Sequence, residues 1–142
     1  MEGENHMQFQ ASVGYAIRIL QYLYTHTEEE VTTAHEISQS VCTTYPFATR
    51  IVHQLKQKGL VSSVQGRYGG YRLARPAREI SVYDIVLAMQ GELGINHCLR
   101  KDHCGRNSAD CCGMQDFFQE VQESLIARLS SKNIADFDSL WS

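Results

Sequence analysis

The densest group of reactive side chains lies in residues 97–112, HCLRKDHCGRNSADCC. This segment holds most of the chain's 5 cysteines together with two histidines: Cys98, Cys104, Cys111, Cys112, His97 and His103. Thiolates and imidazoles are the side chains that bind zinc and iron–sulfur clusters. The segment therefore predicts a metal or cluster site in a polar loop.

Composition limits the setting of that site. A chain of 142 residues, of which 43% are hydrophobic, can bury one ordinary core, or one small domain with a helical extension. No apolar run reaches the roughly 20 residues of a membrane span, and residues 1–9 lack the basic and apolar regions of a signal peptide. We therefore expect a cytoplasmic protein with no membrane partner, in which clustered cysteines bind metal or sense redox state rather than form disulfides.

The net charge of -3 conceals an uneven distribution. Residues 50–78 contain no acidic side chain and seven basic ones: Arg50, Lys56, Lys58, Arg67, Arg72, Arg75 and Arg78. Residues 79–142 carry ten acidic and five basic side chains. Because a phosphate backbone responds to the local surface rather than to the average, the basic stretch favours nucleic acid as a partner.

Two short helical patterns lead into the basic stretch. Thr33 is a candidate N-cap for the segment AHEIS. Thr44 or Tyr45 precedes Pro46 at the start of a second segment, which has a helical apolar stripe and which Gly59 ends. Two helices joined by a brief turn, the second with polar and basic residues outward, predict a helix-turn-helix.

A predicted β-hairpin follows directly. Residues 60–64 and 71–74 have strand character, and the glycine-rich segment QGRYGG joins them. A helix-turn-helix followed by a hairpin with a basic tip can place a helix in the major groove while the hairpin reaches the backbone or the minor groove. This pattern predicts a winged helix.

The remaining segments extend this unit. Residues 12–26 have the apolar periodicity of a helix, for which Ser12 is the candidate N-cap. Ser81 with Asp84 forms a capping-box pattern before a helix over residues 82–90. After the cysteine loop, a long apolar stripe recurs at helical spacing: Met114, Phe117, Phe118, Val121, Leu125 and Leu129. This stripe either packs back on the first helix or pairs with a second copy, and the two-fold pair is the favoured interpretation.

The expected fold is therefore mainly α with a small β-hairpin wing. We expect a winged helix-turn-helix DNA-binding domain over residues 7–78. Residues 79–142 would supply a linker helix, a cysteine-rich loop (92–113) and a long dimerisation helix.

The motifs YAIRIL, LKQKGLVSSVQGRYGGYRLARP and ISVYDIVLAM, followed by a cysteine loop, resemble the IscR and NsrR family of bacterial winged-helix regulators. The resemblance covers about residues 7–129. It implies a homodimeric transcription factor, most often a repressor, that binds an inverted-repeat operator in double-stranded DNA. The sensing members of that family hold an iron–sulfur cluster through three cysteines of this loop.

The resemblance assigns Cys98 and Cys104 as the first two cluster ligands and Cys112, or else Cys111, as the third. It favours a two-iron over a four-iron cluster. Where relatives use an acidic residue or a histidine as the fourth ligand, this chain has Gly14 and Gln115. The open alternatives are His97, His103, Gln115, the spare cysteine or an exogenous ligand. Cys42 matches no ligand and is expected to be a small buried residue.

The predicted DNA contacts lie on the second helix of the helix-turn-helix and at the wing tip. They are Thr44, Tyr45, Thr49, Arg50, His53, Arg67 and Tyr68. Arg50 could bind guanine through two hydrogen bonds, whereas Lys56 and Lys58 would contact phosphate.

The expected function is DNA-binding transcriptional regulation controlled by a cluster that senses redox state, nitric oxide or iron–sulfur status. The alternatives are a clusterless regulator with a thiol or zinc switch, an iron–sulfur electron carrier or redox enzyme, and a purely structural zinc loop. The sequence contains no recognisable arrangement of nucleophile, base and orienting group, so we expect no enzymatic activity.

Overall fold

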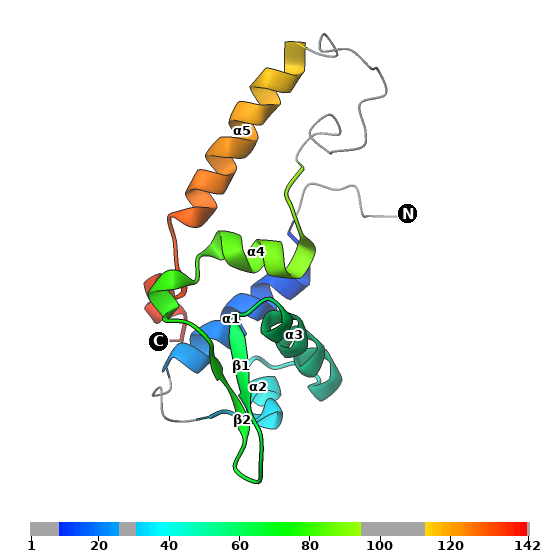
Figure 1. Ribbon diagram of the computed structural model, residues 1–142, viewed down its shortest axis with the longest axis vertical. Helices are drawn as coiled ribbons and strands as arrows, with labels where there is room; N and C mark the ends of the chain where they lie inside the picture. Colours follow the sequence, from blue (N-terminus) through cyan, green and yellow to red (C-terminus); the bar gives the residue numbers. More distant parts are fainter. Residues whose placement is uncertain (1–8, 26–30, 95–112, 142) are drawn as a thin grey trace.

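The computed structural model describes residues 9–25, 31–94 and 113–141 (Figure 1). Its elements are α1 (Ala11–Thr25), α2 (Ala34–Ser40), α3 (Tyr45–Gln57), β1 (Val61–Val64), β2 (Gly70–Leu73), η1 (Ala77–Glu79), α4 (Val82–Gln90), α5 (Gly113–Ser130) and η3 (Ile134–Trp141). β1 and β2 form an antiparallel hairpin. The mainly helical fold with a β-hairpin wing is therefore confirmed.

Helix α1 lies at the centre of the hydrophobic core. Its buried face consists of Val13, Ala16, Ile19, Leu20 and Leu23. α1 packs against α3 and α4, and all three helices contribute to one continuous core. Removing this apolar surface from water is the main source of stability for the helices that carry the basic stretch.

The end of the chain returns to this core. Ile134 is fully buried, its N–H donates to the Ile80 carbonyl at 3.0 Å, and the buried Gln21 side chain of α1 donates to the Phe137 carbonyl at 2.6 Å. The core thus includes residues on both sides of the boundary that the sequence placed at residue 78, and the two-part division of the chain stays a prediction.

Helix α5 extends away from the rest of the structure, at the opposite end from the hairpin (Figure 1). Leu129, near its C-terminal end, packs against the core, whereas Phe117 is 59% exposed and Val121 is 38% exposed. None of the helices in the described ranges has both the length and the hydropathy of a membrane span.

The two predicted serine caps have different outcomes. Ser81 caps α4: its Oγ accepts from the Asp84 N–H at 3.0 Å, and the Asp84 carboxylate accepts from the Ser81 N–H at 3.1 Å. The capping box is therefore confirmed. The assignment of Ser12 is wrong, because α1 begins at Ala11 and Ser12 lies inside the helix. A serine that precedes an apolar stripe is only a weak marker of where the helix begins.

Replacing Ser81 with alanine leaves the Asp84 N–H without its acceptor. We expect Ser81→Ala to lower the free energy of unfolding by about 0.5–2 kcal/mol, measured by urea denaturation. Ser12→Ala is the matched control, because the hydroxyl of Ser12 makes only an exposed 3.5 Å contact with Gln10. That variant should stay within about 0.5 kcal/mol of the wild type. Equal losses in the two variants would contradict the assignment of the cap.

Candidate nucleic-acid interface

A tight turn orients α3 relative to α2. α2 begins with a capping box in which Thr33 Oγ1 accepts from the Glu36 N–H at 3.2 Å and the Glu36 carboxylate accepts from the Thr33 N–H at 3.4 Å. After α2, Cys42 adopts a φ of 55°, and the Thr43 N–H donates to the Ser38 carbonyl at 3.0 Å. A left-handed residue at this point reverses the chain over very few residues.

Cys42 is exposed, so the expectation of a small buried cysteine is wrong. The preceding residue, Val41, is 2% exposed and belongs to the core. Because the backbone reverses at Cys42, the thiol lies on the solvent side of the turn. A short sequence pattern cannot reveal that reversal.

Helix α3 has defined ends. Thr44 is its N-cap and accepts from the Phe47 N–H at 3.3 Å, and Pro46 lies in the first turn. At the other end, the Leu60 N–H donates to Leu55 O and the Gly59 N–H donates to Lys56 O, each at 3.0 Å. These two bonds, with Gly59 at a φ of 78°, form a Schellman motif that leads directly into the hairpin.

The two faces of α3 differ sharply. Its inner face buries Ala48, Ile51, Val52 and Leu55 in the core. Its outer face carries the predicted contacts Tyr45, which is 44% exposed, together with the exposed Arg50 and His53. The Arg50 guanidinium lies 5.4 Å from the centre of the Phe47 ring, which keeps the charge near the start of the helix.

Thr44 and Thr49 have hydroxyls that already take part in helix bonds. Thr44 is exposed but acts as the N-cap, and Thr49 is half-buried and donates to the Tyr45 carbonyl at 2.7 Å. Each retains acceptor capacity and a methyl group that can face a partner. As DNA contacts, both stay predictions.

The hairpin is tied to the helices by a third extended segment. Thr32 and Tyr71 exchange two backbone hydrogen bonds of 2.9 Å, so residue 32 pairs along β2. This pairing was not predicted from the sequence, although the β-branched run from Val31 to Thr33 is a strand signal. A side chain at Gly70 would collide with the Thr32 backbone, so glycine permits the close approach.

The tip of the wing presents a basic and an aromatic side chain. Arg67 is exposed, Tyr68 is 82% exposed, and the Arg67 guanidinium lies 5.6 Å from the centre of the Tyr68 ring. A side chain at Gly69 would collide with the Val64 carbonyl, so the tight turn requires glycine at that position. An arginine on a projecting hairpin, with no acidic residue between positions 50 and 78, can contact phosphates or the minor groove.

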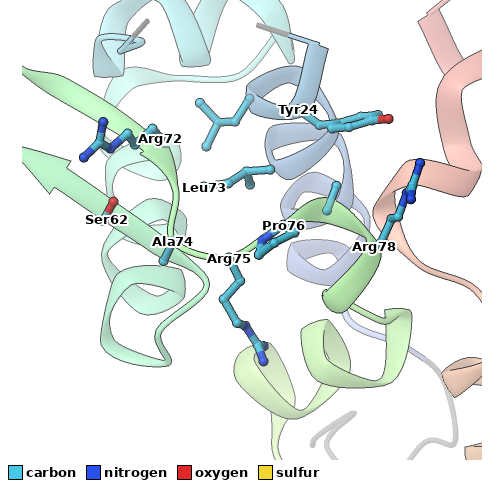
Figure 2. Close-up of a pocket in the computed structure, with 10 residues that line it drawn as sticks. Tyr24, Ser62, Arg72, Leu73, Ala74, Arg75, Pro76 and Arg78 are labelled. Carbon is cyan, nitrogen blue, oxygen red and sulfur yellow. The ribbon is translucent and has the colours of Figure 1, made fainter. Parts of the chain in front are cut away.

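A cavity of about 880 Å³ lies at the base of the wing, where α1, the hairpin and residues 74–78 meet (Figure 2). Arg72, Arg75 and Arg78 line it, but their side chains point in three different directions. Arg75 lies 3.7 Å from the Asp84 carboxylate of α4. Because the three guanidiniums do not converge, the cavity lacks the geometry of a site for one small anion.

Cys98, Cys104, Cys111 and Cys112 lie outside the described residues, as do His97 and His103. Within the described ranges, no three or more histidine, cysteine or acidic side chains come together as potential metal ligands. Gly14 is exposed on α1 and Gln115 is exposed on α5. The assignment of the cluster ligands therefore stays a prediction.

Comparison with known proteins supports this interpretation of the fold. The Rrf2 family, described as iron-dependent transcriptional regulators, matches residues 9–138. Protein aau3 of Rhizobium meliloti (strain 1021) is 31% identical over 124 residues, which cover 82% of this chain and 80% of that protein. The HTH-type transcriptional regulator NsrR of Shouchella clausii (strain KSM-K16) is 24% identical over 132 residues, covering 92% and 87% of the two chains.

Two solved structures share the fold over almost the whole chain. CymR (YrzC), the global cysteine regulator of B. subtilis, superposes with a TM-score of 0.74 at 20% identity, covering 94% of this chain and 98% of that one. IscR of T. potens superposes with a TM-score of 0.69 at 25% identity, covering 94% and 88%. With a capped recognition helix, a basic wing and a family match over residues 9–138, the chain belongs to the Rrf2 family of DNA-binding transcriptional regulators, which are not enzymes.

Proposed function

We propose that this regulator binds its operator as a homodimer and represses transcription, and that an iron–sulfur cluster in the cysteine segment controls its affinity for DNA. The observation that carries the proposal is the place of that segment in the chain. It joins α4, which packs in the core with α1 and α3, to α5, which extends away from the core.

The ligand chemistry of the segment fits such a cluster. Cys98, Cys104 and Cys112 supply three thiolates, with Cys111 as the alternative third ligand, and soft sulfur ligands are what iron–sulfur clusters require. When bound, the cluster would supply a centre that reacts with oxidants and nitric oxide. Relatives named NsrR and IscR support the assignment by their place in the same family.

A chain of contacts through α1 links the end of α4 to the recognition helix. The Gln90 side-chain oxygen, at the last residue of α4, accepts from the Gln10 N–H at 2.9 Å, just before α1 begins. On α1, the edge of the Tyr15 ring meets Phe47 of α3 with a centroid distance of 5.3 Å. A displacement of the residues after α4 can therefore shift α1 and the first turn of α3 together.

Such coupling controls DNA affinity only if the two states of the cysteine segment favour different positions of α3. Phe47 is the contact through which α1 would act, because the Arg50 guanidinium lies over its ring.

The apolar face of α5 supports a second copy as the dimer partner. Phe117 and Val121 are among the exposed large hydrophobic residues, and the Phe117 and Phe118 rings contact each other edge to face at 5.3 Å. An 18-residue helix that projects from the core gains stability by burying this stripe against its equivalent. A two-fold dimer would also match an inverted-repeat operator.

The same segment also supports an alternative, a clusterless regulator with a thiol or zinc switch. The specific observation in its favour is that Cys111 and Cys112 are adjacent, since neighbouring thiols oxidise together or bind soft metals. In that case the same contacts through Gln90 and Tyr15 would transmit the signal.

Arg50→Ala tests the recognition helix. With an operator selected from random duplexes by the wild-type protein, we expect a loss of about 1–3 kcal/mol in binding free energy, because the guanidinium can make two hydrogen bonds to guanine. Arg128→Ala is the matched control, since it removes the same charge from an exposed position on α5. Equal effects of the two substitutions in fluorescence anisotropy would rule out Arg50 as a reader of sequence.

Cysteine variants test the cluster. Anaerobically purified wild-type protein should be coloured and should contain iron and sulfide, and Cys98→Ala or Cys104→Ala should abolish the absorbance. Cys42→Ala is the control, because that exposed thiol lies in the α2–α3 turn and should leave the spectrum unchanged. Comparing Cys111→Ala with Cys112→Ala identifies the third ligand, and we expect Cys112. A colourless preparation that contains zinc, or no metal, would favour the alternative.

Val121→Asp tests the dimer helix. Placing a charge on the exposed apolar stripe should give a monomer by light scattering and weaken operator binding by at least about tenfold, because the two half-sites are no longer bound together. Ala127→Asp introduces the same side chain at an exposed position of α5 outside the stripe, and should remain dimeric. A Val121→Asp variant that stays dimeric would show that α5 does not form the interface.

A further inference from the structure

An exposed aromatic stack joins the two helices of the helix-turn-helix. The His35 ring in the first turn of α2 and the Tyr45 ring at the start of α3 have centroids 4.4 Å apart and planes inclined by 27°. His35 is exposed, and Tyr45 is 44% exposed. Tyr45 is a predicted DNA contact, whereas no role was predicted for His35 from the sequence.

The stack lies outside the hydrophobic core. Neither His35 nor Tyr45 is among the core residues or the partly buried residues packed against them. The first turn of α3 would remain in place without the stack, because the Thr44 cap and the buried Ala48 already hold it. The stack therefore has little influence on the position of the backbone. It restricts the orientation of the Tyr45 side chain instead.

The backbone on both sides of the stack is well defined. His35 lies between Thr33 and Glu36, which form the capping box of α2. Tyr45 directly follows the N-cap Thr44. Two aromatic side chains held on separate capped helices restrict each other's rotation more than either helix would alone.

We propose that His35 is a positioning residue for DNA recognition, which holds the Tyr45 ring in one orientation at the start of the recognition helix. The proposal rests on the proposed role of α3 as the reading helix. An exposed tyrosine that must become ordered on binding loses side-chain entropy, and a ring that is already stacked loses less. His35 therefore extends the determinants of specificity from α3 to α2 without contacting a base.

The test compares four variants with the wild type. All are measured on one operator, which the wild-type protein selects from random duplexes. His35→Ala removes the stacking partner, His35→Phe keeps an aromatic ring, Tyr45→Ala removes the reader, and the double variant His35→Ala with Tyr45→Ala reports their coupling. Dissociation constants are measured at fixed salt for the operator and for a non-specific duplex of equal length.

We expect His35→Ala to weaken operator binding roughly two- to tenfold, the range that corresponds to loss of an aromatic pair. Binding to the non-specific duplex should remain unchanged. His35→Phe should restore operator binding, and the double variant should bind no more weakly than Tyr45→Ala alone. Urea denaturation of each variant separates these effects from loss of folded protein.

Gln39→Ala is the control on α2, because Gln39 is exposed in the last turn of the same helix and should bind the operator like the wild type. Wild-type affinity in His35→Ala, or additive losses in the double variant, would overturn the positioning role. If Arg50→Ala and Tyr45→Ala also bind like the wild type, the recognition surface itself is wrong and this inference falls with it.

Discussion

The burial of one face of α1 fixes how the other helices of the core are placed. Leu20 and Ile19 are fully buried at its centre, and the face they belong to packs against α3 and α4. Because protein interiors are close-packed, none of these helices can move without repacking its neighbours. α3, α4 and η3 therefore belong to one packed unit.

Two exposed surfaces lie outside this shared core and apart from each other. The wing, which carries Arg67 and Tyr68 at its tip, lies at one end of the molecule, and α5, which carries the exposed Phe117, extends toward the other (Figure 1). The outer face of α3 presents Arg50. In α3, the buried face contributes stability and the exposed face is available to a partner. The contact of Gln10 with Gln90 joins the end of α4 to the start of α1, and that of Tyr15 with Phe47 joins α1 to α3.

Features with a local cause were predicted well from the sequence. The capping box of Ser81 and the helix end at Gly59 each depend on residues within a few positions of one another, and both were confirmed. Of the two residues predicted at the start of the second helix, Thr44 is the N-cap. The Ser12 cap was wrong because a stripe of apolar residues does not mark where its helix begins. The burial of Cys42 was wrong because one left-handed residue reversed the direction of its side chain.

The winged helix, the basic stretch and the set of candidate sulfur ligands could all be predicted from the sequence, because residue types, periodicity and glycine positions specify these features locally. Three contacts became visible only in the folded protein: Thr32 pairs with Tyr71, Ile134 completes the core beside Ile80, and His35 stacks on Tyr45. Each of these contacts joins separate elements or distant segments, and short-range periodicity carries no information about which of them will meet. They form because the close packing of α1 with its neighbours brings them together.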